Sequence, residues 1–169
     1  MDTKTIKWTK EIREKFIKEA GRVLDVGSLD INGSVKHLFS DAKEYIGIDT
    51  RKGKNVDIVM NAHDIYSRFG KDSFDTVLCY NMLEHDDLFW VTLENMKKVL
   101  RTGGWLIMSI PTYGFPTHDH PRDYWRVSGE AYRNILLRGF QMLDLTKIFT
   151  KRIEGKEVNP VFVCLGRKL

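Results

Sequence analysis

Cysteine is scarce in this sequence: Cys79 and Cys164 are the only two among 169 residues. Each stands inside an apolar run, which is the usual setting of a small buried side chain and not of a reactive thiol. Two widely separated cysteines provide neither a disulfide scaffold nor a cysteine-zinc site. Both of these protein classes are therefore excluded.

Long apolar runs are also absent. No stretch approaches the roughly 18 consecutive apolar residues that a membrane-spanning helix needs. The first ten residues alternate charged and apolar side chains, where a signal peptide would have a continuous apolar segment. The hydrophobic fraction of 42% is nevertheless sufficient for a core. We therefore expect a soluble, cytoplasmic protein with no membrane partner.

Neither sign of charge dominates, because 27 basic residues face 23 acidic ones and give a net charge of +4. The only basic bunches are short, at Arg51–Lys54, Lys97–Lys98 and Arg167–Lys168. Such bunches are more typical of a solvated face than of a nucleic-acid interface, so a nucleic-acid partner is disfavoured. The length, and the lack of any linker or repeat, predict one domain over residues 1–169.

Short apolar runs alternate with helical patterns along the chain. Five strands are predicted, at residues 22–26, 45–49, 56–60, 74–80 and 105–110. Helices are predicted within 1–21, with the apolar stripe at 10–20, after Gly33, from Asp86 or Asp87 to Arg101 before Gly103-Gly104, and from Ser128 to Gly139.

Two further strand-like runs, 140–149 and 158–165, flank a Glu154-Gly155 turn and predict an antiparallel hairpin. The fold class is therefore α/β: a mostly parallel sheet of seven strands, with helices on both faces and the antiparallel hairpin at its C-terminal side. Folds of this kind bind ligands at the carboxyl ends of their strands.

The loop after the first predicted strand carries Asp25, Gly27 and Gly33. Its glycines allow a tight turn and a close approach to a ligand, but their spacing is not the G-x-G-x-x-G pattern of dinucleotide-binding proteins. A carboxylate at position 25 would repel a pyrophosphate and would favour a ligand that carries an ammonium or sulfonium cation. The loop therefore fits a ligand with an adenosine end and a cationic amino-acid end.

Acids also follow the next two predicted strands. Asp49 stands where a carboxylate accepts hydrogen bonds from the two ribose hydroxyls of a nucleoside. Asp64 could accept the exocyclic amine of adenine, with Ala62 and His63 flanking the ring. One such acid is more often a solvated turn, but three in this order predict a nucleoside site.

Residues 111–127 contain three of the four prolines, both histidines of a His-x-His and little periodicity, which predicts a functional loop on the acceptor side. A general base drawn from this loop would be His118, His120 or Asp123, with Tyr113 as a further candidate. A metal is not expected, because the neighbouring ligands of His118-Asp119-His120 have poor geometry without a distant fourth.

Tyr124-Trp125-Arg126 could stack on a planar acceptor or clamp an acidic one, and could equally pack as a lid on the fifth strand.

The ordered motifs resemble those of class I S-adenosylmethionine-dependent methyltransferases, nearest the small domains known as type 11. The resemblance spans Val23 to Ile110 and rests on segments 23–27, 46–49, 62–64, 74–85 and 99–104. A second patch, 120–128, resembles a subgroup of these proteins. The first loop departs from the family pattern by being one or two residues longer. The resemblance implies a Rossmann-like three-layer sandwich, S-adenosyl-L-methionine as cofactor and methyltransferase activity.

Roles are implied residue by residue. The implied cofactor-binding residues are Asp25, Gly27, Ser28, Gly33, Asp49, Thr50, Ala62, His63, Asp64, Asn81, Met82 and Leu83. The expected acceptor-binding residues are His85, Tyr113, Tyr124, Trp125 and Arg126. In some relatives a pair like Glu84-His85 helps to bind a divalent cation or acts near the acceptor, although such a pair more often only opens the following helix.

Methyl transfer to a small-molecule or glycan acceptor is the function that we expect, because the short chain leaves little room for a separate substrate domain. The alternatives are a non-catalytic cofactor-binding partner subunit and a methyltransferase acting on RNA or protein. A nucleotide-binding oxidoreductase is disfavoured by Asp25 and by the absent glycine pattern.

Overall fold

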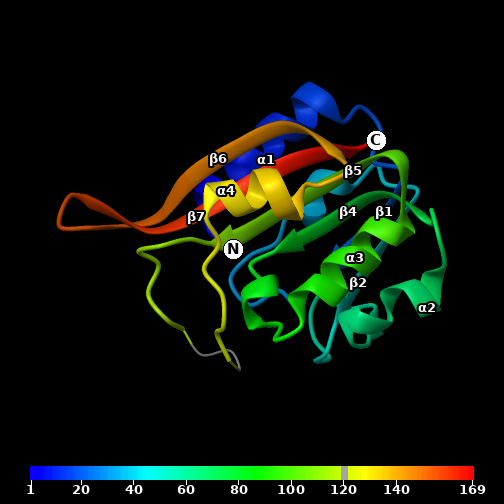
Figure 1. Ribbon diagram of the computed structural model, residues 1–169, viewed down its shortest axis with the longest axis horizontal. Coiled ribbons are helices and arrows are strands. Elements are labelled where there is room, and N and C mark those ends of the chain that lie inside the picture. Colours follow the sequence, from blue (N-terminus) through cyan, green and yellow to red (C-terminus); the bar gives the residue numbers. More distant parts are fainter. Residues whose placement is uncertain (119–121) are drawn as a thin grey trace.

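A seven-stranded mixed sheet forms the centre of the protein in a computed structural model that describes residues 1–118 and 122–169 (Figure 1). The strand order is β3-β2-β1-β4-β5-β7-β6. β1 to β5 are mutually parallel where they pair, whereas β7 runs antiparallel to both β5 and β6. The strands are β1 (Arg22–Val26), β2 (Glu44–Asp49), β3 (Ile58–Val59), β4 (Phe74–Tyr80), β5 (Leu100–Pro111), β6 (Phe140–Ile153) and β7 (Lys156–Lys168). The predicted fold class is confirmed.

The helices cover both faces of this sheet (Figure 1). They are α1 (Thr3–Phe16), α2 (Ile65–Phe69), α3 (Phe89–Val99) and α4 (Gly129–Ala131). Short helical turns are η1 (Lys36–Phe39), η2 (Ala62–Asp64), η3 (Leu83–His85) and the π-helical η4 (Tyr132–Leu136). Among the described residues, no helix is both long and apolar enough to cross a bilayer.

Two separate cores explain the three layers. Successive residues of a strand point to opposite faces of the sheet, and Leu106 and Ile107 of β5 accordingly enter different clusters. One cluster contains Met96 of α3, and the other contains Trp8 and Ile12 of α1. Because both faces are buried, the central strands read as continuous apolar runs.

The N-terminal helix differs from its prediction. The apolar stripe at residues 10–20 predicted a helix that ends at Gly21, but α1 begins earlier and ends at Phe16. Asp2 caps its start, since the Asp2 side chain accepts a hydrogen bond from the backbone of Thr5 at 2.9 Å. Ile17 and Ala20 are buried instead in the extended segment that leads into β1.

Three other predicted elements are corrected. The helix before Gly103-Gly104 ends at Val99, and the two glycines lie inside β5, beside a register shift between Phe74 and Thr76 of β4. The third strand, predicted at residues 56–60, comprises only Ile58–Val59. In place of the helix expected after Gly33, the structure has only the short turn η1. Short apolar runs fix neither the length nor the ends of an element.

The C-terminal hairpin is confirmed and is longer than predicted. β6 and β7 pair from Phe140↔Lys168 to Ile153↔Lys156. Glu154 and Gly155 both have positive φ angles, 46° and 78°, as a two-residue hairpin turn requires. The tip projects beyond the body of the protein (Figure 1).

Candidate active site

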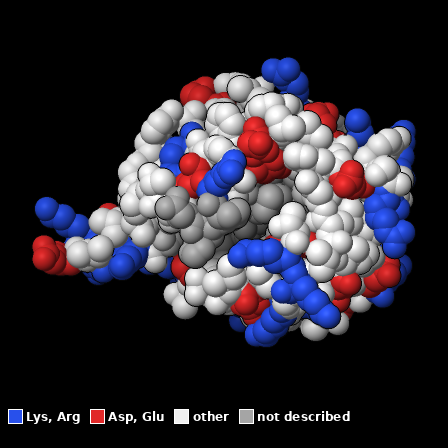
Figure 2. Space-filling model, turned by 90° about the horizontal axis from the view of Figure 1, so that it is seen from below, with Lys and Arg blue, Asp and Glu red and all other residues white. Residues whose placement is uncertain are grey.

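A cavity of about 660 Å³ lies at the carboxyl ends of β1, β2 and β4. Figure 2 shows a hollow in this face, with acidic and basic side chains at its edge. Most of the residues predicted to bind a cofactor line it: Asp25, Gly27, Ser28, Gly33, Asp49, Thr50, Ala62, His63, Asn81 and Met82. The parallel sheet brings together loops that are far apart in the sequence, as the strand-end argument requires.

Asp25 is the buried acid of this cavity. Only 5% of the residue is exposed, and the Tyr45 hydroxyl donates a hydrogen bond of 2.6 Å to its Oδ2. Burial raises the pKa of Asp25 to about 6, because a carboxylate is harder to ionise away from water, and the Tyr45 hydrogen bond counteracts part of this rise. A ligand cation beside Asp25 would restore the favourable environment of its charged form.

We expect the affinity for S-adenosylmethionine to rise with pH through the pKa of Asp25. Below about pH 6 the carboxyl is mostly protonated and attracts the ligand's ammonium only weakly, so binding at about pH 5 should be roughly ten-fold weaker than at about pH 7. Calorimetry across this range measures the effect. Asp25→Asn should abolish the pH dependence, and Tyr45→Phe should move the midpoint upward. An unchanged profile in Asp25→Asn would assign the dependence to another group.

Close backbone approach shapes the first loop. Gly27 has a φ of +80°, and a Cβ there would lie 2.6 Å from Cγ of Met82. The backbone amides of Gly27 and Ser28 both donate to the Ile48 carbonyl, at 2.9 and 3.0 Å, so this turn is held against β2. The Ser28 hydroxyl is buried, lines the cavity and has no hydrogen-bond partner among the described residues. It is therefore a ready partner for a polar ligand group.

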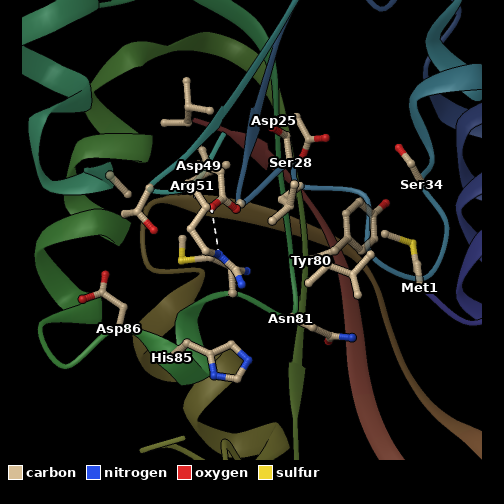
Figure 3. Close-up of a pocket in the computed structure, with 18 of the residues that line it drawn as sticks. Met1, Asp25, Ser28, Ser34, Asp49, Arg51, Tyr80, Asn81, His85 and Asp86 are labelled. Carbon is tan, nitrogen blue, oxygen red and sulfur yellow. Dashed lines mark hydrogen bonds and ion pairs between the residues drawn. The ribbon is translucent and has the colours of Figure 1, made fainter. Parts of the chain in front are cut away.

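Asp49 ends β2 and points into the same cavity (Figure 3). Its Oδ1 accepts a hydrogen bond of 2.9 Å from the backbone of Arg51, and the Arg51 side chain lies 3.7 Å away. Asp49 thus keeps lone pairs available for two neighbouring hydroxyls, with Arg51 close to the same position. This geometry fits a ribose.

The adenine side of the cavity contains a pair that was not predicted. His63 Nε2 lies 2.9 Å from Oδ1 of Asp86, and both residues line the wall. Asp64, which was expected to bind the adenine amine, is instead exposed and lies outside the wall, because it ends η2 and leads into α2. Leu83 is buried beneath the wall in the core of the α3 face.

Asn81 follows β4 in an unusual backbone conformation, with a φ of +47°. Ser109 holds it there: the Ser109 hydroxyl donates to Asn81 Oδ1 at 2.7 Å, and the Asn81 amide donates to the Ser109 carbonyl at 2.9 Å. Non-glycine residues with positive φ are costly and are concentrated at functional sites. Asn81 and Met82 form the floor of the cavity near the sheet's centre.

The far end of the cavity carries histidines. His85 and His118 both line it, and their rings meet edge to face with centroids 4.9 Å apart. His118 Nδ1 lies 3.0 Å from Oδ2 of Asp123, an oxygen that also accepts the backbone amide of His118 at 2.8 Å. Hydrogen bonds from Arg126 hold the pKa of Asp123 well below its usual range, so this carboxylate is charged.

Glu84 lies behind the two histidines. It is fully buried, and burial raises its pKa to about 8. Its Oε1 lies 3.8 Å from His85 Nε2 and 3.9 Å from His118 Nε2. The Glu84-His85 pair lies in the turn η3, before α3 begins at Phe89.

The loop after β5 docks on this region. The Tyr124 amide donates to the Glu84 carbonyl at 2.7 Å, and the Trp125 indole donates to the Asp86 carbonyl at 2.8 Å. The Trp125 ring also packs against Phe89 of α3. The loop thereby brings His118 to the cavity.

The remaining residues expected to bind the acceptor do not line the cavity. Trp125 packs on α3, whereas Tyr124 is 41% exposed and Tyr113 is 71% exposed. Arg126 donates hydrogen bonds to Asp123 and to the carbonyls of Phe115 and Pro116. Trp125 therefore packs, but against the η3–α3 segment and not on the fifth strand, where the packing alternative placed it. His120 lies outside the described residues.

Four important residues were missed as parts of the site: Arg51, Asp86, Phe115 and Glu84. Arg51 was hidden in a basic bunch that resembles a solvated face, and Asp86 was interpreted only as a helix cap. For Glu84 the available signal was its position, because an acid that closely follows a strand end can reach the ligand-binding edge of the sheet.

Several solved structures share this fold. Burkholderia thailandensis 1,6-didemethyltoxoflavin-N1-methyltransferase, with bound 1,6-didemethyltoxoflavin and S-adenosylhomocysteine, has a TM-score of 0.72 at 18% identity, covering 96% of this chain and 77% of that one. The N-methyltransferase NodS from Bradyrhizobium japonicum, in complex with S-adenosylhomocysteine, has a TM-score of 0.67 at 13% identity, with coverages of 98% and 86%. The [4+2]-cyclase SpnF has a TM-score of 0.73 at 14% identity, with coverages of 96% and 80%. A search among curated proteins gave no match.

The fold is shared with solved methyltransferases, and the family match gives the class: S-adenosylmethionine-dependent methyltransferases. Residues 24–108, half of the chain, match the family model described as a methyltransferase domain, and the chain belongs to this family. The protein is thus an S-adenosylmethionine-dependent methyltransferase. The unpartnered Ser28 hydroxyl and the carboxylates of Asp25 and Asp49 fit the cofactor's polar groups.

Proposed function

We propose that the protein transfers the methyl group of S-adenosylmethionine to a small-molecule acceptor, including the end of a glycan. One observation carries this proposal: a single cavity wall contains both the cofactor-side acids and, at its far end, His85 and His118. An acceptor that enters at the histidines would therefore meet the cofactor's reactive end within one cavity. The whole chain, residues 1–169, serves as one domain in this proposal, acting in the cytoplasm.

The protein's own contribution is mainly positioning. The bound cofactor supplies a methyl group on a sulfonium, which is transferred in line to the acceptor's nucleophilic atom. Asp25 and Asp49 would hold the cofactor through its charged and hydroxyl groups, and Asn81 and Met82 line the same cavity. Fixing both reactants and excluding water provide most of the acceleration in such a reaction.

A hydroxyl acceptor, or an amine that arrives protonated, must also lose a proton. His118 is the group at which we place this loss, because it lines the cavity and lies 3.0 Å from the charged carboxylate of Asp123. His118 Nδ1 and that carboxylate are close enough for an ion pair but do not form a hydrogen bond, and Nε2 is the other ring nitrogen that could take the proton.

The volume of the cavity limits the size of the acceptor. A volume of about 660 Å³ is within the range of small-molecule sites, and it must hold the cofactor as well. The toxoflavin methyltransferase with its bound small heterocycle supports an acceptor of this size for the fold.

Transfer of a labelled methyl group tests the proposal. The full chain is incubated with methyl-labelled S-adenosylmethionine and a panel of small hydroxyl, amine and glycan acceptors, with RNA and protein as separate arms. We expect label in a small or glycan acceptor only. Label in RNA or protein would contradict the proposed acceptor class. Cofactor binding without any transfer would favour a non-catalytic subunit or other chemistry, such as that of the cyclase with the same fold.

A further inference from the structure

We propose that Glu84, His85 and His118 bind one divalent transition-metal ion of the zinc type at the acceptor end of the cavity. One ligand atom from each of these three residues lies within 4.8 Å of the other two. The set joins the end of β4 to the loop after β5, which are more than thirty positions apart in the sequence. It supplies the distant ligand that the His-x-His sequence alone lacked.

The carboxylate of Glu84 points to a missing cation. The residue is 0% exposed, and neither of its oxygens has a hydrogen-bond partner among the described residues. Burying a charged carboxylate without a partner is costly, so native proteins protonate such groups, pair them or use them as metal ligands. Arg126 does not provide the missing charge by hydrogen bonding, since its guanidinium is engaged by Asp123 and by backbone carbonyls.

Both histidines are oriented as metal ligands are. The His85 Nδ1 contacts the Arg122 carbonyl, and the His118 Nδ1 lies 3.0 Å from Asp123 Oδ2, a distance that allows an ion pair although the two atoms do not have hydrogen-bond geometry. A backbone carbonyl and a carboxylate are the usual outer partners of metal-bound histidines, because they keep the proton on one nitrogen and direct the lone pair of the other. In each ring the other nitrogen, Nε2, is the atom that faces Glu84.

The separations suit an ion better than a shared proton. A direct hydrogen bond would need about 2.7–3.2 Å between the heavy atoms, whereas Glu84 Oε1 lies 3.8 and 3.9 Å from the two Nε2 atoms. Two ligands of one tetrahedral zinc ion lie roughly 3.4 Å apart, given metal–ligand bonds of about 2.1 Å. The three ligand atoms lie within 4.8 Å of one another, so side-chain rotations would have to bring them closer to reach this spacing.

The location of the set implies a role for the ion. His85 and His118 line the cavity while Glu84 lies behind them, so the ion's open coordination position would face the acceptor. An acceptor hydroxyl on such an ion has a lowered pKa and loses its proton near neutral pH. This part deepens the proposed function and rests on it: His118 would promote proton loss as a ligand and not as a free base.

Metal binding is tested without cofactor, acceptor or activity. The full chain is freed of metal with a chelator and titrated with Co²⁺, whose visible absorption reports tetrahedral coordination, and then with Zn²⁺ in competition. We expect one equivalent of Co²⁺ with tetrahedral absorption bands, displaced by Zn²⁺. His118→Ala and Glu84→Gln should each weaken binding by more than about 100-fold, because each removes a ligand. His37→Ala, which removes an exposed histidine outside the cavity, should bind as the parent does.

No tetrahedral Co²⁺ species, or equal binding by the parent and His118→Ala, would overturn the metal site. The His118 variant keeps the test decisive even if Glu84→Gln does not fold, because His118 lies in a partly exposed loop. Methyl transfer by a protein that binds no metal would leave the proposed function standing, with His118 as the direct base. Metal binding without methyl transfer to any small acceptor would support the metal site and contradict the proposed function.

Discussion

Asp49→Ala should weaken S-adenosylmethionine binding by about 100-fold or more. A carboxylate that accepts two hydroxyl hydrogen bonds contributes roughly 1.5–3 kcal/mol through each, and a factor of ten corresponds to about 1.4 kcal/mol. Asp49 lies at the end of β2 on the cavity wall, where no other carboxylate of β2 can replace it. Calorimetric titration of parent and variant measures the loss.

Two further variants make this result specific. Asp49→Asn keeps the shape and one acceptor oxygen but loses the charge, so its affinity should lie between those of the parent and the alanine variant. Asp41→Ala removes an aspartate that pairs with Arg13 outside the cavity wall, and it should bind normally. Parent-like affinity in Asp49→Ala would show that the ribose is bound elsewhere.

His118→Ala should lower the rate of methyl transfer by at least about 100-fold while leaving cofactor affinity within about two-fold. Groups that move a proton in the transition state contribute about 10² to 10⁴ to the rate, and the same loss is expected if His118 acts as a metal ligand. The cofactor-side acids lie at the other end of the cavity wall and are not paired with His118. Single-turnover transfer to the acceptor found in the panel gives the rate, and calorimetry gives the affinity.

His37→Ala is the matched control for this variant, since His37 is exposed on η1 and outside the cavity. An unaffected rate in His118→Ala would mean that the acceptor loses no proton in the slow step. A loss of cofactor affinity equal to the loss of rate would instead show that His118 positions the cofactor.

The sheet and the cofactor side of the cavity were predictable because they depend on local patterns. Each central strand is an apolar run whose two faces are both buried, and Asp25 and Asp49 come directly before or at strand ends. In a parallel sheet those ends meet at one edge, so the spacing in sequence was enough to group them. The hairpin was predictable for a similar reason, since Glu154-Gly155 specifies its own turn.

The acceptor end was not predictable in the same way. Which residues face the cavity there depends on how the loop after β5 folds back onto the η3–α3 segment through hydrogen bonds of Tyr124 and Trp125. Neither the hydrophobic periodicity of a segment nor its local structural propensity predicts such a contact between distant segments. For that reason the sequence did not show that Trp125 packs on α3, that Tyr113 and Tyr124 are exposed, or that Glu84 is buried beside two histidines.

The central claim is that this cavity binds S-adenosylmethionine. Calorimetric titration of the full chain with S-adenosylmethionine and S-adenosylhomocysteine is the measurement that tests it, supported by the thermal midpoint of unfolding with each ligand. We predict that one molecule of either ligand binds per chain in the micromolar range and raises the midpoint. No heat and no stabilisation from either ligand would show that the cavity is not an S-adenosylmethionine site.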